Sequence, residues 1–382
     1  MRTDDPAPPA LFPYMTWAQT ESFRSPYSLS QSGMPMPDAS LLGPALEPGE
    51  CLPWPCAGAM QALEARVARW HGVEPERVLA VPGASAGMHL VADTFFRGAR
   101  VLYETPRYEP LEALPRLFAA EPRALARRPE TGWLPDPEEA GRLAHGASGA
   151  AHLFLTNPHN PTGSVVDRAG LQALGAVVAE HGGVVACCEV YMDFCPDPQD
   201  RVHAANVLPN GITIGSMTKA WGLGPLRVGW IVLGEAVAHL RGLLIDRAHL
   251  TWVDPPTASL VLADRALGRA DALLQPVRQV EATCRPLLDA WLRGTEGVES
   301  LVPPMGIYAF PRLEGIRDTR AFARWLAETH GVDVVAGEHF GFPGAIRVGC
   351  GVPEETLRTG LQRLDEGLIA YRAGRSNPAP PG

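Results

Sequence analysis

Between about residues 57 and 250, short apolar runs alternate with amphipathic segments of helical period. This alternation is typical of βαβ units, in which crossover helices join parallel strands. It predicts an α/β fold with a mostly parallel sheet flanked by helices. Strands are expected at 77–81, 100–104, 151–156, 183–188, 211–216 and 227–233, and helices at 59–70, 86–97, 109–119, 136–145, 167–181 and 234–248.

The pattern changes after "VDPP" at 253–256. A long helical stretch to about 293 precedes a strand near 307–312, a helix at 319–330, a strand at 345–349 and a final helix from 354. This mixture predicts a smaller α+β domain. The expected division is an N-terminal arm that also joins the small domain (1–50), a large domain (51–255), a C-terminal small domain (256–372) and a disordered tail (373–382).

The composition excludes several classes of protein. With 46% hydrophobic and 20% charged residues the chain is typical of a globular protein, and its formal charge of −9 argues against nucleic-acid binding. No apolar run reaches spanning length and the start "MRTDDPAPPA" is not a signal, so we expect a cytoplasmic protein without a membrane partner. Seven cysteines without a CxxC motif indicate neither a metal site nor a disulfide framework.

Four polar stretches directly follow predicted strands: "PGASAG" at 82–87, "TNPHNPTG" at 156–163, "CCEVYMDF" at 187–194 and "SMTK" at 216–219. Ligands of open parallel sheets bind at the carboxyl ends of strands, where loops lead into helix N-termini whose free N–H groups favour anions. The first stretch is therefore either an ordinary turn or an anion cradle. The cradle would be made by the backbone amides of Ala84, Ser85 and Ala86 with the Ser85 hydroxyl.

Lys219 is the single lysine among the 33 lysine and arginine residues of the chain. Arginine replaces lysine wherever only a positive charge is needed, but a guanidinium cannot lose a proton near neutral pH and become a free amine nucleophile. Lys219 is therefore a candidate for covalent chemistry. On the count alone, a surface lysine that survived by chance is the open alternative.

Taken together and in this order, these stretches resemble fold type I pyridoxal-phosphate (PLP) enzymes of the class I/II aminotransferase family. The resemblance extends from "LSQSGMP" at 29–35 to "AIRVGCG" at 345–351 and rests on NPxNPTG, xExYxDF and SxTKxxGLxxxRxGW. It implies a large domain with a mostly parallel sheet and a smaller α+β domain. It also implies that Lys219 forms the Schiff base with PLP, and that Ser85, Ser216 and Arg227 bind the cofactor phosphate with the amides of Ala84 and Ala86.

The resemblance also assigns the remaining site residues. Tyr108 is at the position of the aromatic ring that stacks on the pyridine, and Asn160 and Tyr191 match the pair that hydrogen-bonds the cofactor's O3′, next to the catalytic Lys219. Arg347 matches the arginine that binds the substrate α-carboxylate, a task suited to its planar fork. Gly33 lies on the segment that closes over the substrate.

One cofactor-binding position departs from the family pattern. Three residues before Tyr191 the family has an aspartate, which keeps the pyridine nitrogen protonated, and this chain has Cys188. A neutral thiol, with an ordinary pKa near ~8.5, cannot hold a pyridinium, so the electron sink is expected to be weaker. Glu189 is adjacent on the strand and therefore points to the opposite face, as a structural residue.

These residues leave several functions open. The first is a homodimeric PLP enzyme that acts at the α-amino group and Cα of an amino acid or amino-acid conjugate by transamination. The alternative, suggested by Cys188, is β-elimination such as C–S cleavage of a cysteine conjugate, or decarboxylative or oxidative PLP chemistry. A PLP-binding regulator is a remote third. A neighbouring subunit often supplies a tyrosine to the cofactor phosphate, and here Trp54 is the only loose match. The segment from Phe12 to Arg24 and Arg107 are candidates to line the pocket.

Overall fold

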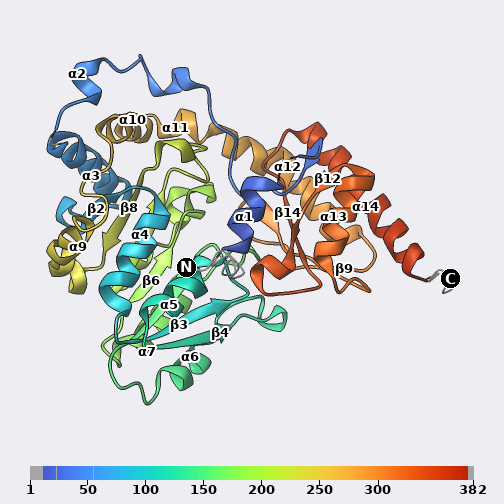
Figure 1. The fold of residues 1–382 in the computed structure, drawn as a ribbon, viewed down its shortest axis with the longest axis horizontal. Helices are drawn as coiled ribbons and strands as arrows, with labels where there is room; N and C mark the ends of the chain where they lie inside the picture. The colour runs from blue at the N-terminus through green and yellow to red at the C-terminus, as the bar shows by residue number, and fades with distance from the viewer. Residues whose placement is uncertain (1–11, 23, 55, 377–382) are drawn as a thin grey trace, which may run out of the picture.

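The computed structural model describes residues 12–22, 24–54 and 56–376 of the chain. Its centre is a seven-stranded sheet in the order β2-β8-β7-β6-β5-β3-β4 (Figure 1). Within this sheet only β8 runs antiparallel to its neighbours, so the sheet is mostly parallel, as predicted. The strands are β2 (Val78–Val81), β3 (Arg100–Thr105), β4 (Glu121–Ala126), β5 (Ala151–Thr156), β6 (Val185–Cys188), β7 (Gly211–Ser216) and β8 (Gly229–Leu233).

Helices cover both faces of the sheet. Every residue of β5, β6 and β7 is buried, which explains why these strands form continuous apolar runs in the sequence. On one face lie α6 (Pro137–Ala144), α7 (Arg168–Ala179) and α8 (Ala204–Val207). The other face is covered by α3 (Ala57–His71), α4 (Ala84–Val91), α5 (Pro110–Phe118) and α9 (Arg241–Ala248). Neighbouring side chains on β6 alternate, so that Cys187 packs with the first group and Cys188 with the second.

The edge strand β4 was not predicted. Its sequence, "EPRALA", begins with a glutamate and a proline and includes an arginine, and most of its side chains are at least partly exposed. Proline and charged residues are tolerated on an edge strand because one side of its backbone has no partner strand. The apolar pattern used to find the buried strands is therefore absent from β4.

The C-terminal part contains a three-stranded antiparallel sheet made of β10 (Tyr308–Ala309), β14 (Ile346–Gly349) and β13 (Val335–Ala336). The helix predicted at 319–330 is α13 (Thr319–His330), and the strand predicted near 307–312 is two short strands, β10 and β11 (Arg312–Leu313). The long helical stretch is α10 (Thr257–Leu267), α11 (Ala270–Leu273) and α12 (Gln275–Gly294). The domain division between 255 and 256 stays a prediction.

The last helix, α14 (Glu354–Ser376), extends into the segment predicted as a disordered tail, so residues 373–376 are helical, while residues 377–382 lie outside the described residues. The helix continues because residues 369–374, "IAYRAG", contain no proline. Within the part of the chain that the structure describes, no helix combines the length and apolarity needed to cross a membrane.

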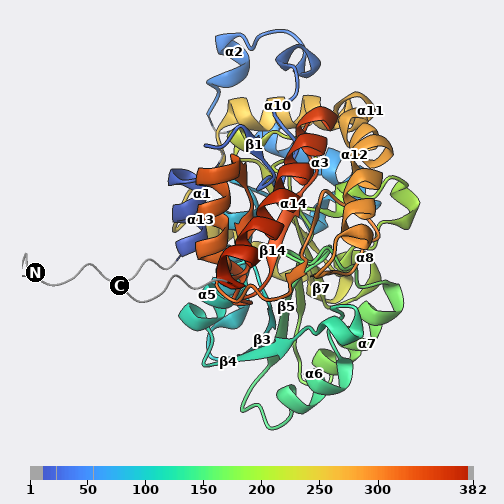
Figure 2. The ribbon, with the colours of Figure 1, turned by 90° about the vertical axis from the view of Figure 1, so that its right-hand side faces the viewer.

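The N-terminal arm joins the C-terminal part. Its strand β1 (Tyr27–Ser28) pairs in parallel with β12 (Val332–Asp333), and its helix α1 (Pro13–Thr20) lies beside α13 (Figures 1 and 2). Farther along the arm is the short helix α2 (Pro48–Cys51). Residues 1–11 of the predicted arm lie outside the described residues. After α2 the chain continues into α3 and then β2, which is an edge strand of the large sheet.

Candidate active site

A cavity of about 580 Å³ lies at the carboxyl ends of β5, β6 and β7, with α1 forming part of its wall. A larger cavity of about 670 Å³ lies between α1 and α13; part of the candidate lining segment from Phe12 to Arg24 borders it, but none of the predicted catalytic, cofactor-binding or substrate-binding residues does. The predicted residues that line the 580 Å³ cavity are Ala84, Ser85, Tyr108, Asn160, Cys188, Tyr191, Ser216, Lys219 and Arg227. The four polar stretches thus meet at one place because the parallel sheet aligns the strand ends.

An anion cradle forms where β2 leads into α4. Gly83 has a φ of +85°, and a Cβ on it would lie 2.5 Å from Nη2 of Arg227, so only glycine allows the guanidinium to lie against the start of the helix. The first N–H groups of α4, from Ala84 to Ala86, have no acceptor inside the helix. Together with the hydroxyls of Ser85 and Ser216, they make a site suited to a dianion such as a phosphate group.

Lys219 follows β7 and its side chain is half-buried. Its Nζ donates a hydrogen bond to Oγ of Ser32 (2.9 Å) and lies 5.7 Å from the ring centroid of Tyr191. Gly33 packs on the backbone of the lysine, since a Cβ on it would lie 3.3 Å from the Lys219 carbonyl oxygen. The lysine amine therefore lies inside the cavity between Tyr191 and the arm.

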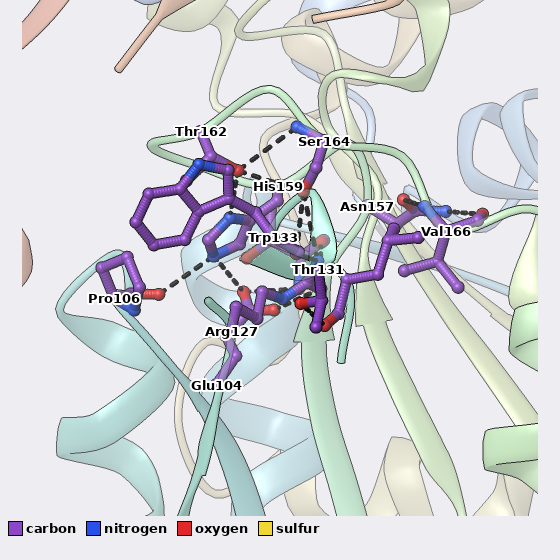
Figure 3. Close-up of polar contacts among 12 residues, drawn as sticks. Glu104, Pro106, Arg127, Thr131, Trp133, Asn157, His159, Thr162, Ser164 and Val166 are labelled. Atoms are coloured by element: carbon purple, nitrogen blue, oxygen red, sulfur yellow. Dashed lines mark hydrogen bonds and ion pairs between the residues drawn. The ribbon is translucent and has the colours of Figure 1, made fainter. Parts of the chain in front are cut away.

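The loop after β5, which carries Asn160, is held by hydrogen bonds of Asn157 and His159 (Figure 3). The Asn157 side chain accepts a hydrogen bond from the N–H of Val166 (2.9 Å) and donates one to the carbonyl of the same residue (3.0 Å). One ring nitrogen of the buried His159 contacts the carbonyl oxygen of Pro106 (2.9 Å). These contacts fix the loop on both sides of Asn160, at Asn157 and Val166, and at the adjacent His159.

A fully buried ion pair supports the same loop. Nη2 of Arg127 lies 2.6 Å from Oε2 of Glu104, and Oε1 of Glu104 accepts a hydrogen bond from the N–H of Thr156 at 2.8 Å (Figure 3). Arg127 also donates to the carbonyl of Trp133 (3.1 Å). Removing one partner of a buried pair leaves an uncompensated charge and costs about 3–5 kcal/mol. The pair therefore joins β3 to the end of β5 beside the cavity.

Arg347, on β14, is buried and lies next to Asn160. Its Nη1 donates to Oδ1 of Asn160 (2.9 Å), and its Nη2 donates to the hydroxyl of Tyr14 (3.0 Å) and to the carbonyl of Ser30 (3.1 Å). Within residues 12–22, 24–54 and 56–376, no carboxylate oxygen lies within 4.0 Å of its guanidinium nitrogens, and its Nε is buried without a hydrogen-bond partner. A buried cation without an anion is costly, so this arginine is poised for an anionic ligand.

Cys188 lies on the cavity side of β6. Burial, reinforced by the nearby carboxylates of Glu189 and Glu104, raises the pKa of its thiol to about 12, so the thiol is neutral at physiological pH. Glu189 points to the other face of the sheet, where its carboxylate contacts Nδ1 of His203 (2.6 Å) and accepts from the N–H of Ala204 (2.7 Å). The alternation predicted along this strand is confirmed, and Glu189 does not reach the cavity.

The candidate lining segment from Phe12 to Arg24 does reach the cavity through Tyr14, although sequence reasoning gave Tyr14 no role of its own, and it did not identify Ser32. The proline in the first turn of α1, at position 13, was a signal for a helix in the arm. It does not show where the helix packs. Of the other proposed lining residues, Arg107 instead pairs with Glu112, to which its Nε donates (2.6 Å).

Residues 52–364 match the family described as aminotransferase class I and II. The chain is 32% identical over 278 residues to capreomycidine synthase of Streptomyces vinaceus (72% of this chain, 70% of that protein). It is 28% identical over 320 residues to arginine–pyruvate transaminase AruH of Pseudomonas aeruginosa (80% and 79%). A crystal structure of a PLP-dependent aminotransferase from Streptococcus suis matches with a TM-score of 0.80, 25% identity and coverage of 91% and 94%.

Proposed function

This chain belongs to the aminotransferase class I and II family, and from that premise we propose that it transfers the α-amino group of an amino acid to a 2-oxo acid with Lys219 carrying the cofactor. It is a PLP-dependent, aminotransferase-like enzyme of fold type I. The position of Lys219 in the cavity supports its assignment as the residue that carries the cofactor. The only lysine of the chain lines the same cavity as the anion cradle and the pair Asn160 and Tyr191.

The residues present fit PLP. The cradle of Ser85, Ser216 and Arg227 suits its phosphate, and Gly83 lets the Arg227 guanidinium lie against the start of α4. The ring would lie near Tyr108. When it is joined to a primary amine through its aldehyde, this cofactor withdraws electrons from the substrate Cα and labilises the bonds at that carbon.

Three residues of the chain then have distinct tasks. Arg347 binds the α-carboxylate and so fixes which bond at Cα is aligned for cleavage. Asn160, whose Oδ1 accepts a hydrogen bond from Nη1 of Arg347, holds the guanidinium in this orientation. Lys219 takes the Cα proton on its amine and returns it, as a general base held within the cavity.

Product analysis of the purified enzyme tests this function. L-Arginine with pyruvate is the first pair, because one relative is named for it, followed by a panel of amino acids and cysteine thioethers with and without a 2-oxo acid. We expect a new amino acid to form only when the 2-oxo acid is present. Release of a thiol or a dehydro product, with no amino transfer to any 2-oxo acid, would contradict the proposal and establish elimination.

Elimination is the second candidate because Cys188 is a neutral thiol. It occupies the position where the family resemblance predicts an aspartate paired with the ring nitrogen. We expect Cys188→Asp to raise the rate of amino transfer on the order of tenfold, since a carboxylate would favour the protonated ring by about one pKa unit.

Cys188→Ser is the matched control, because it is also neutral and of similar size, and we expect it to behave as wild type. The measurements are single-turnover rates with an amino acid and the absorbance of the bound cofactor. If the aspartate and serine variants behave alike, the weakened electron sink has no role in this enzyme.

We also propose a cytoplasmic homodimer. Three large apolar side chains are exposed in the segment that leads from the arm to α3, Met36 (72%), Leu52 (75%) and Trp54 (80%), which is a costly arrangement for a free surface. Trp54, the loose match to the tyrosine that a neighbouring subunit supplies in many relatives, does not line the cavity of its own chain. The seven free cysteines are typical of a reducing compartment.

A further inference from the structure

Tyr14 is fixed firmly although it lies on the N-terminal arm. Its N–H donates to Oε1 of Glu109 (2.9 Å), which ties the start of α1 to the N-terminal end of α5. Its ring is 8% exposed and packs in a cluster that includes Phe310 and Phe340 of the C-terminal part. Tyr108 meets it edge-on at 6.1 Å between centroids. The phenol therefore connects both parts of the protein at the cavity.

The Tyr14 hydroxyl lies where positive charges converge. It accepts a hydrogen bond from Nη2 of Arg347 (3.0 Å) and lines the cavity that contains Lys219. Burial alone would raise its pKa, but Arg347, Lys219 and the hydroxyl of Ser32 hold the pKa of Tyr14 below its ordinary value. Such a phenol is a strong hydrogen-bond donor, and its own proton remains available while its oxygen accepts from arginine.

We propose that Tyr14 is a substrate-binding residue that stands in for a carboxylate oxygen at Arg347 in the free enzyme and hydrogen-bonds the α-carboxylate of the bound amino acid. An incoming carboxylate needs two donors on adjacent guanidinium nitrogens, and one donor of Nη2 is directed at Tyr14. When the carboxylate takes that donor, the phenol turns from acceptor to donor. This assignment rests on the proposed role of Arg347 and extends carboxylate recognition to the arm.

The test compares each amino acid with the amine that lacks its carboxylate. Wild type and Tyr14→Phe, both loaded with PLP, are titrated with L-arginine and agmatine and with L-alanine and ethylamine, and the absorbance of the bound cofactor gives the dissociation constants. We expect Tyr14→Phe to weaken binding of the amino acids by about tenfold or more, the value of one hydrogen bond to a charged group, and to leave the amines unchanged.

Thr20→Ala is the control on the same helix, because the exposed Thr20 hydroxyl bonds only within α1, to the carbonyl of Thr16 (2.7 Å). It should leave all four constants unchanged. An equal loss for amino acid and amine in Tyr14→Phe would show a merely structural role and overturn the proposal. So would unchanged amino-acid binding, or a wild type with no preference for either amino acid over its amine. The titration needs no turnover, so it gives an answer even if amino transfer is not the reaction.

Discussion

Lys219→Arg and Lys219→Ala are expected to abolish covalent attachment of PLP and to lower turnover by at least about 10³-fold, within the range for loss of a positioned general base. The arginine variant keeps the positive charge in the cavity but offers no free amine. Absorbance of the purified proteins and peptide mass after borohydride reduction measure attachment. Because the chain has one lysine, a reduced cofactor adduct on wild type should be found on a single peptide.

Arg168→Lys is the matched control for this experiment. It adds a second lysine at an exposed position at the start of α7, outside the cavity. The reduced adduct should remain on the Lys219 peptide of this variant. Finding the bound-cofactor absorbance intact in Lys219→Arg, or the adduct on residue 168, would contradict the assignment.

Arg347→Lys should lower kcat/KM for amino acid donors by about 100-fold, through KM more than kcat. An ammonium is a point charge that cannot make the two parallel hydrogen bonds of a guanidinium to a carboxylate, and about 3 kcal/mol is a reasonable loss for such bonds. The variant also removes the contact with Asn160, which wild type makes through Nη1 at 2.9 Å. Steady-state kinetics with the best donor of the panel measure the effect.

Arg358→Lys provides the comparison, since Arg358 is exposed on α14 and pairs with Glu354 one turn away. It should leave both kinetic constants unchanged. Thermal unfolding of both variants separates loss of binding from loss of folded protein. An Arg347→Lys enzyme with the KM of wild type would show that the carboxylate is bound elsewhere.

Much of the fold followed from patterns that are local in the sequence. Strands β5 and β7 begin and end at the predicted residues, because strands buried on both faces consist mostly of apolar and small residues. The strand β4 and the helix α1 were missed for the opposite reason. Strand β4 is an edge strand whose side chains are largely in contact with solvent, so its sequence is not apolar. Helix α1 is short, and its position depends on the residues it packs against.

The amino-acid sequence by itself determined the family, the cofactor and the cluster of polar residues at the strand ends, because each motif directly follows a strand and parallel strands bring their ends together. It also identified Cys188 as a departure, although only burial beside two carboxylates established that its thiol is neutral. The tertiary structure alone decided the partners of Arg347. Tyr14 is 333 positions away in the chain, and a contact over that distance depends on how the arm packs across both parts of the protein, which no local pattern encodes.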